Sequence, residues 1–102
     1  MNITIGSLLG NEKEFYLGTA VLITANFEIA PDSVTITVRS PSGIKEVDTA
    51  SMTMKADTFY EYVYQSVVGD IEGDYIVTVE AISDSYKEVN ETTFGLLRQA
   101  FQ

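Results

Sequence analysis

Apolar and polar residues alternate along several short stretches of the chain, and turn residues separate these stretches. The clearest stretch is 33–39, where valine or isoleucine fills every even position and polar residues fill the positions between. A period of two residues is typical of a β-strand with one buried face. The same reasoning predicts eight strands, over 2–5, 19–27, 33–39, 44–47, 50–55, 58–67, 75–82 and 88–96.

Strong turn signals recur about every ten residues, which is the spacing of an antiparallel sandwich. Pro31-Asp32, Pro41-Ser42-Gly43 and Asp84-Ser85 are examples, and no long helix fits between them. We therefore predict an all-β fold, a sandwich of seven to eight antiparallel strands. The prediction places one domain over 1–96 and a C-terminal tail over 97–102.

The composition agrees with a folded β-domain. Thr, Val and Ile make up 30 of the 102 residues, and 45% hydrophobic with 21% charged residues is ordinary for a globular chain. The chain has no His and no Cys, which excludes Ser-His and Cys-His nucleophile pairs, disulfides and the usual zinc sites. Carboxylate pairs such as Glu46 and Asp48 lie in predicted edges without an aromatic cleft, so we predict a protein that is not an enzyme and needs no cofactor.

The net charge of −9 and the placement of the cations bear on partners and location. The six Lys and Arg residues are scattered, so we expect no nucleic-acid binding. No apolar run is long enough for membrane insertion, and the first residues lack the pattern of a signal peptide. If Met1 is the native start, the chain is made without a secretion signal.

The segment Asp70-x-x-Gly73-x-Tyr75-x-Val77 resembles the corner that enters strand F of immunoglobulin-like domains. In those domains a tyrosine hydroxyl bonds back to the upstream backbone. The resemblance implies that Tyr75 is this tyrosine, with Asp70 and Gly73 in the structural corner. It also implies that Val77 stands where antibody domains have a cysteine, opposite Ile23 or Val21.

A wider resemblance covers roughly 15–96 and includes 18–27, 31–43, the Tyr60-x-Tyr62-x-Tyr64 ladder and Gly73-Asp-Tyr75. The chain is similar to small stand-alone immunoglobulin-like proteins encoded among the head and neck genes of tailed phages. It is also similar to immunoglobulin-like modules of bacterial and archaeal surface proteins. The first likeness implies a structural protein of a tailed-virus particle, located in the virion. The second implies an adhesion or spacer module, extracellular or on the cell surface.

An acidic turn and a tyrosine ladder are candidate ligand sites. Asp70, Glu72 and Asp74 alternate in a turn and could offer oxygen ligands to Ca²⁺, but their spacing does not match the EF-hand loop. A solvated acidic turn is the favoured interpretation, so no metal is predicted. The tyrosine ladder over 60–64 could bind carbohydrate or protein, and we favour a core role because Glu61 alternates with it.

The C-terminal tail is the candidate partner-binding segment. Leu97, Arg98 and Phe101 follow the last predicted strand, and large apolar groups outside a compact sandwich either fray or dock. The first and last strands carry few lysines and no proline to protect their edges. We therefore expect contacts with other structural protein subunits in a multi-copy assembly, with Leu97 and Phe101 as anchors.

Overall fold

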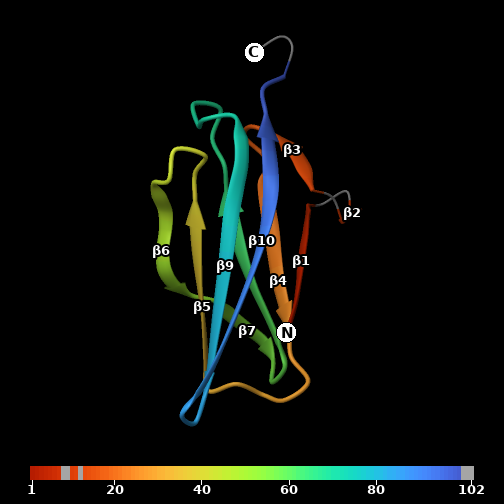
Figure 1. Cartoon of the computed structure of the whole chain (residues 1–102). Coiled ribbons are helices and arrows are strands. Elements are labelled where there is room, and N and C mark those ends of the chain that lie inside the picture. The colour runs from red at the N-terminus through yellow and green to blue at the C-terminus, as the bar shows by residue number, and fades with distance from the viewer. Residues whose placement is uncertain (8–9, 12, 100–102) are drawn as a thin grey trace.

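The computed structural model describes residues 1–7, 10–11 and 13–99, and these form two five-stranded sheets packed face to face (Figure 1). One sheet has the order β2-β1-β4-β8-β7 and the other β3-β10-β9-β5-β6. The described residues contain no helix. The predicted all-β sandwich is confirmed, and short strands raise the number from the expected seven to eight to ten in the described part of the chain.

The bounds of the strands follow the turn signals. They are β1 (Asn2–Ser7), β2 (Gly10–Asn11), β3 (Glu14–Tyr16), β4 (Ala20–Asn26), β5 (Ser33–Arg39), β6 (Lys45–Ser51), β7 (Thr53–Ala56), β8 (Phe59–Gln65), β9 (Gly73–Ser83) and β10 (Tyr86–Leu97). Strand β5 has the bounds that its alternating pattern predicts.

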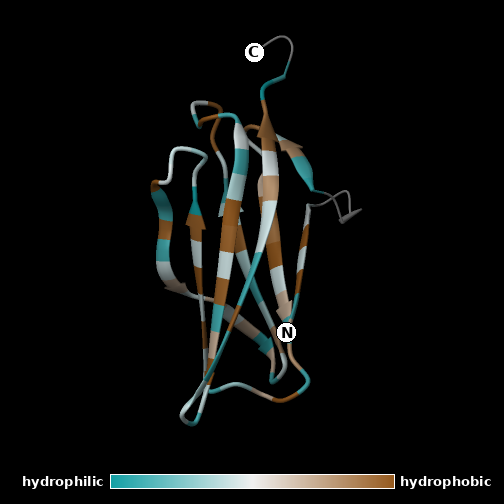
Figure 2. Cartoon of the chain, in the orientation of Figure 1, coloured by the Kyte–Doolittle hydropathy of each residue, from teal (hydrophilic) through white to brown (hydrophobic). Residues whose placement is uncertain are grey.

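The core lies between the sheets and is built from every second residue of the central strands. Val21, Ile23, Ile36, Val77 and Val79 are completely buried. Because their neighbours along each strand point outward, the strands carry alternating apolar and polar bands (Figure 2). Burial of this kind contributes roughly 25 cal/mol per Å² of apolar surface, and the core needs no disulfide.

The chain changes sheets at Met52, and here the sequence prediction was wrong in detail. We expected a break between 47 and 50, but β6 runs through this segment. Thr49 adopts a positive φ of 51° and donates its backbone N–H to Thr37 Oγ1 at 3.1 Å, so the strand bulges instead of ending. Buried Met52 donates its N–H to Val34 O, and β7 then pairs with β8 in the other sheet.

Strand β3, which the pattern did not predict as a strand, pairs with the end of β10 in parallel. Gly95 donates its N–H to Lys13 O at 2.7 Å, and Leu17 donates its N–H to Leu97 O at 2.8 Å. All other strand pairs are antiparallel in the described residues, as expected. Leu97 therefore ends a strand, so the tail in the described structure begins one residue later than predicted.

Candidate functional site: the two ends of the sandwich

Apolar side chains are exposed at both ends of the sandwich. We call the end formed by the β4–β5 loop, the β9–β10 turn and Met1 the hairpin end. We call the opposite end, where β3, β8 and β10 finish, the corner end. Each end offers a surface for contact with another molecule.

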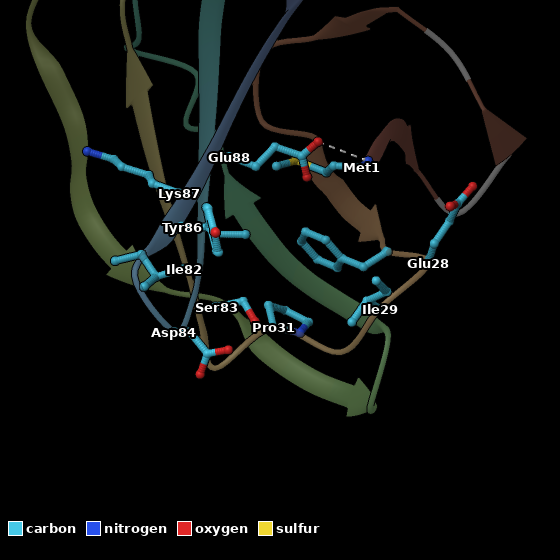
Figure 3. A pocket seen from close by; sticks show the side chains of 12 residues that line it. Met1, Glu28, Ile29, Pro31, Ile82, Ser83, Asp84, Tyr86, Lys87 and Glu88 are labelled. Carbon is cyan, nitrogen blue, oxygen red and sulfur yellow. Dashed lines mark hydrogen bonds and ion pairs between the residues drawn. The ribbon is translucent and has the colours of Figure 1, made fainter.

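A groove of about 400 Å³ lies at the hairpin end (Figure 3). Two hydrogen bonds hold its walls together: Asp32 donates its backbone N–H to Ile82 O at 2.7 Å, and the Asp32 carboxylate accepts the Asp84 N–H at Oδ2 at 2.8 Å. Asp84 has a positive φ of 55°, which makes the two-residue turn between β9 and β10 tight. The groove is therefore formed by two loops that are tied to each other.

The groove is lined largely by apolar side chains. Figure 3 shows Ile29 and Pro31 of the β4–β5 loop across from Ile82 and Tyr86 of the β9–β10 hairpin. Ile29 is 80% exposed and Tyr86 is 79% exposed. Phe27, also in the lining, packs edge-on against the buried Tyr60 with ring centroids 5.9 Å apart, which anchors the groove to the core.

Acidic groups border this groove. Glu28, Asp84 and Glu88 line it, together with Lys87 and Met1. Lys87 Nζ lies 3.6 Å from Glu80 Oε1, and the Met1 amine lies 3.4 Å from Glu88 Oε2. Both cations are thus directed toward carboxylates of the protein itself, and Glu28 and Asp84 remain to attract a basic ligand.

The corner end contains the hydrogen bond that the resemblance implied. Tyr75 donates its hydroxyl proton to the carbonyl oxygen of Ile71 at 2.8 Å. The Tyr75 ring stacks on Phe94 with centroids 5.5 Å apart and planes 13° apart. Burial raises the pKa of Tyr75, and the Asp70 carboxylate adds to the rise. Burial and the same carboxylate also raise the pKa of Tyr64.

The three carboxylates of the acidic turn have separate surroundings. Asp70 Oδ2 accepts the Val67 N–H at 2.9 Å, Glu72 lies 3.6 Å from Arg98 Nε, and Asp74 sits in β9 opposite Gly95. Over residues 1–7, 10–11 and 13–99, no three acidic, His or Cys side chains gather closely enough to hold a metal ion. Asp70 thus acts on the turn itself, as a cap for a backbone N–H.

The tail residues are only partly within the described structure. Leu97 is 41% exposed at the end of β10, and Arg98 is exposed and paired with Glu72. Phe101 lies outside the described residues. The exposed apolar residues of the corner end include Tyr16, Ile44, Val67, Val68, Ile71 and Leu97.

The tyrosine ladder belongs to the core. Tyr60 and Tyr64 are buried, and Tyr62 packs against the same cluster from its edge. This confirms the core interpretation and leaves no exposed platform of three tyrosines for carbohydrate.

Sequence reasoning missed the groove at the hairpin end. Ile29 falls in a predicted loop and Tyr86 follows a predicted turn, so both are large apolar residues where the chain should meet water. The exposed positions of these two residues were the signal that the sequence offered for a binding surface. The sequence could not show that the two loops lie close together, because their proximity depends on the pairing of β5 with β9.

The comparisons with known proteins add little to the fold. No protein-family model matches the chain, and no curated protein matches it. Among solved structures, it is similar to a family 123 glycoside hydrolase from Clostridium perfringens, studied for glycolipid glycan hydrolysis. The match has 11% identity and a TM-score of 0.41, and it covers 96% of this chain and 27% of that chain. The chain thus spans about a quarter of that protein's length. Within the described part, no helix is long and apolar enough to cross a membrane.

Proposed function

We propose that the protein is a non-enzymatic structural subunit of a tailed-virus particle and acts through contacts with other protein subunits. The observation that carries the proposal is the exposure of apolar side chains at both ends of one body that measures 49 × 28 × 16 Å. Isolated exposed apolar residues are ordinary, but groups of them at the ends of an elongated domain suit contacts with neighbours.

The charge of the chain fits the same function. A net charge of −9 keeps free copies apart in solution. Contacts must then be apolar or must meet a basic surface, and the two ends offer apolar groups of both aliphatic and aromatic kinds. Subunits of this type associate only when the correct neighbour supplies a matching surface.

A second candidate is a spacer or adhesion module of a bacterial or archaeal surface protein. The observation that favours it is the position of the first and last described residues, which lie toward opposite ends of the long axis (Figure 1). Modules with this arrangement can be joined end to end in one chain.

Fractionation of the source culture separates the two candidates. Particles are purified on a density gradient, cell envelopes are isolated in parallel, and peptides of this chain are quantified in each by mass spectrometry. Recovery at several copies per particle supports the viral subunit, and enrichment in the envelope supports the surface module. Absence from both fractions would overturn both proposals.

Charge insertion at the ends tests whether the apolar groups make the contacts. Ile29→Lys at the hairpin end and Val68→Lys at the corner end should each reduce incorporation at least tenfold. Val63→Lys is the matched control, since Val63 is 52% exposed in the middle of β8. If all three variants incorporate equally, the ends are not the contact surfaces.

A further inference from the structure

The outer edge of β10 is open along most of its length. Strand β3 covers only 95–97 of β10, and no described strand pairs with this edge over 86–94. The residues of β10 from Tyr86 to Glu91 are all exposed. An unpaired edge presents a row of backbone donors and acceptors that another strand can use.

The pairing of β10 identifies the backbone groups on the open edge. Gly95 N–H and Leu97 C=O face β3, and alternate residues of a strand direct these groups to the same side. The N–H and C=O groups on the open edge therefore belong to Lys87, Val89, Glu91 and Thr93. The backbone N–H and C=O groups of the even-numbered residues point toward β9 instead.

One of these open-edge donors is satisfied by a local side chain. Glu91 donates its N–H to Oδ1 of the adjacent Asn90 at 3.0 Å. An asparagine that caps its neighbour in this way substitutes for a missing strand partner. The Asn90 amide also donates to Met1 O at 3.3 Å, so the side chain bridges the edge and the N-terminus.

The features that normally protect an edge are few here. The register between β9 and β10 is continuous from Tyr86 to Leu96 without a bulge, and β10 contains no proline. Its single lysine, Lys87, lies 3.6 Å from Glu80, and from outside the strand Lys13 Nζ donates to Thr92 Oγ1 at 2.9 Å. The edge is thus long and regular, which favours addition of a strand.

The surroundings define the chemistry of the added strand. Met1 and Ile3 of the facing sheet pack only partly against the core, and apolar side chains on the inner face of an added strand would cover them. On the outer face, Lys87 of β10 lies 3.6 Å from Glu80 of β9, and Glu91 of β10 favours a basic residue opposite it on an added strand. Acidic Glu28 and Asp84 of the adjacent groove act in the same direction.

We propose that the open edge of β10 binds an extended segment of a partner protein as an added antiparallel or parallel strand, with basic residues outward and apolar residues inward. This inference rests on the proposed function and names the kind of neighbour that the subunit binds. A second copy of this chain fits less well, because each copy carries a charge of −9 and Glu88 and Glu91 at the same edge. Strand addition of this kind combines backbone hydrogen bonds with alternate side-chain contacts.

The test uses a fluorescein-labelled peptide, acetyl-KVKVKVK-amide, added to the full chain and followed by fluorescence anisotropy. Val89→Pro removes one open-edge N–H without touching the ladder to β9, so it should weaken binding at least tenfold. Val89→Thr keeps the N–H and should bind within twofold of the unmodified protein. Both variants have the same charge, so equal binding to the two would show simple charge attraction and would overturn the inference.

Amide hydrogen exchange on the unmodified protein gives a readout that does not depend on a variant. Addition of the peptide should slow exchange at least tenfold at Lys87, Val89, Glu91 and Thr93 and leave the even-numbered amides of β10 unchanged. Protection elsewhere, or at none of these positions, contradicts strand addition. The acidic peptide acetyl-EVEVEVE-amide should give no protection.

Two further outcomes separate this inference from related alternatives. If sedimentation equilibrium finds a dimer that Val89→Pro converts to a monomer, the edge binds a second copy and the proposed partner is wrong. If the chain is found in purified particles while the β10 amides gain no protection from the peptide, the inference fails and the proposed function stands. If the chain binds the peptide at the β10 edge but is absent from particles and envelopes, the inference stands and the proposed function fails.

Discussion

Tyr75 contributes to stability through both its ring and its hydroxyl group. The ring stacks on Phe94 in the core, and the hydroxyl donates to Ile71 O across the turn before β9. Tyr75→Phe keeps the ring and removes one hydrogen bond, so we expect a loss of about 1 kcal/mol in the free energy of unfolding. Val77→Ala, at a completely buried position, should cost about 1 to 3 kcal/mol through the cavity that it leaves. Urea denaturation measures both, and unchanged midpoints would contradict the roles assigned to these residues.

Gly73 is required at its position for two reasons. Its φ is +130°, and a Cβ built on it would lie 2.8 Å from Cγ of Pro41. We expect Gly73→Ala to lower the free energy of unfolding by more than about 1 kcal/mol, because backbone strain and the clash add. Gly69→Ala is the matched control, since no atom lies within 4 Å of its Cβ and its φ is not in the left-handed region. Equal melting temperatures for the two variants would contradict the strain and the clash with Pro41 that we assign to Gly73→Ala.

The buried phenols predict a loss of stability at alkaline pH. The pKa values of Tyr64 and Tyr75 are raised in the folded protein above the ordinary value of 10, chiefly by burial. Below pH 10 both phenols are protonated in the folded and unfolded states, so their ionisation does not reduce the free energy of unfolding. As pH rises past 10, unfolding releases protons, and each group lowers the free energy of unfolding by up to about 1.4 kcal/mol per pH unit.

Melting temperatures measured by circular dichroism between pH 8 and 12 test this expectation. Tyr64→Phe should make the melting temperature fall less steeply above pH 10 than it does in the unmodified protein. Tyr86→Phe is the control because Tyr86 is 79% exposed. If the melting temperature of Tyr64→Phe falls with pH as steeply as that of the unmodified protein, Tyr64 is not a source of the alkaline loss of stability.

At the scale of elements, the acidic turn has a structural function that predicts its response to calcium. The Asp70 carboxylate already accepts a backbone N–H, and Glu72 lies beside Arg98. We expect millimolar CaCl₂ to leave the melting temperature within about one degree, because a ligand stabilises only where its concentration exceeds its dissociation constant. Magnesium chloride at the same ionic strength is the control. A rise of several degrees with calcium alone would identify a metal site.

Some elements could be predicted from the sequence because a local pattern determines them. Strand β5 alternates without exception and pairs on both sides, so its bounds follow from its residues. Strand β3 could not be predicted, because three residues become a strand only through distant pairing with β10. The break expected after residue 47 failed because Thr49 adopts a positive φ, which is uncommon for a β-branched residue.

The candidate site was less predictable than the fold. The tyrosine corner carries a local sequence signal, and its hydrogen bond spans only four residues. The groove and the open edge of β10 depend on which strands lie next to each other and on where β3 stops. A single sequence contains no local pattern for either property.

At the scale of the whole molecule, the tail prediction needs a deletion that respects β10. Removing 97–102 would also remove Leu97 O, which accepts the Leu17 N–H and holds β3 in place. Removing 100–102 spares this bond, the Glu72–Arg98 pair and the interaction that Gln99 makes, while it deletes Phe101. We expect this shorter deletion to melt within a few degrees of the full chain and to reduce incorporation into particles. Normal incorporation would exclude Phe101 as an anchor, and a collapsed melt would make the deleted segment part of the fold.

The parallel pairing of β3 with β10 has a mechanical consequence when the chain is pulled from the residues before β3 and after β10. Because the two strands run in the same direction, tension that draws the N-terminal side of β3 away from the C-terminal side of β10 acts along the strands. The hydrogen bonds between them are then loaded in shear and share the force, whereas in a hairpin pulled open at its end they would break one after another. A chain pulled through the residues before β3 and after β10 would therefore resist stretching through this short ladder.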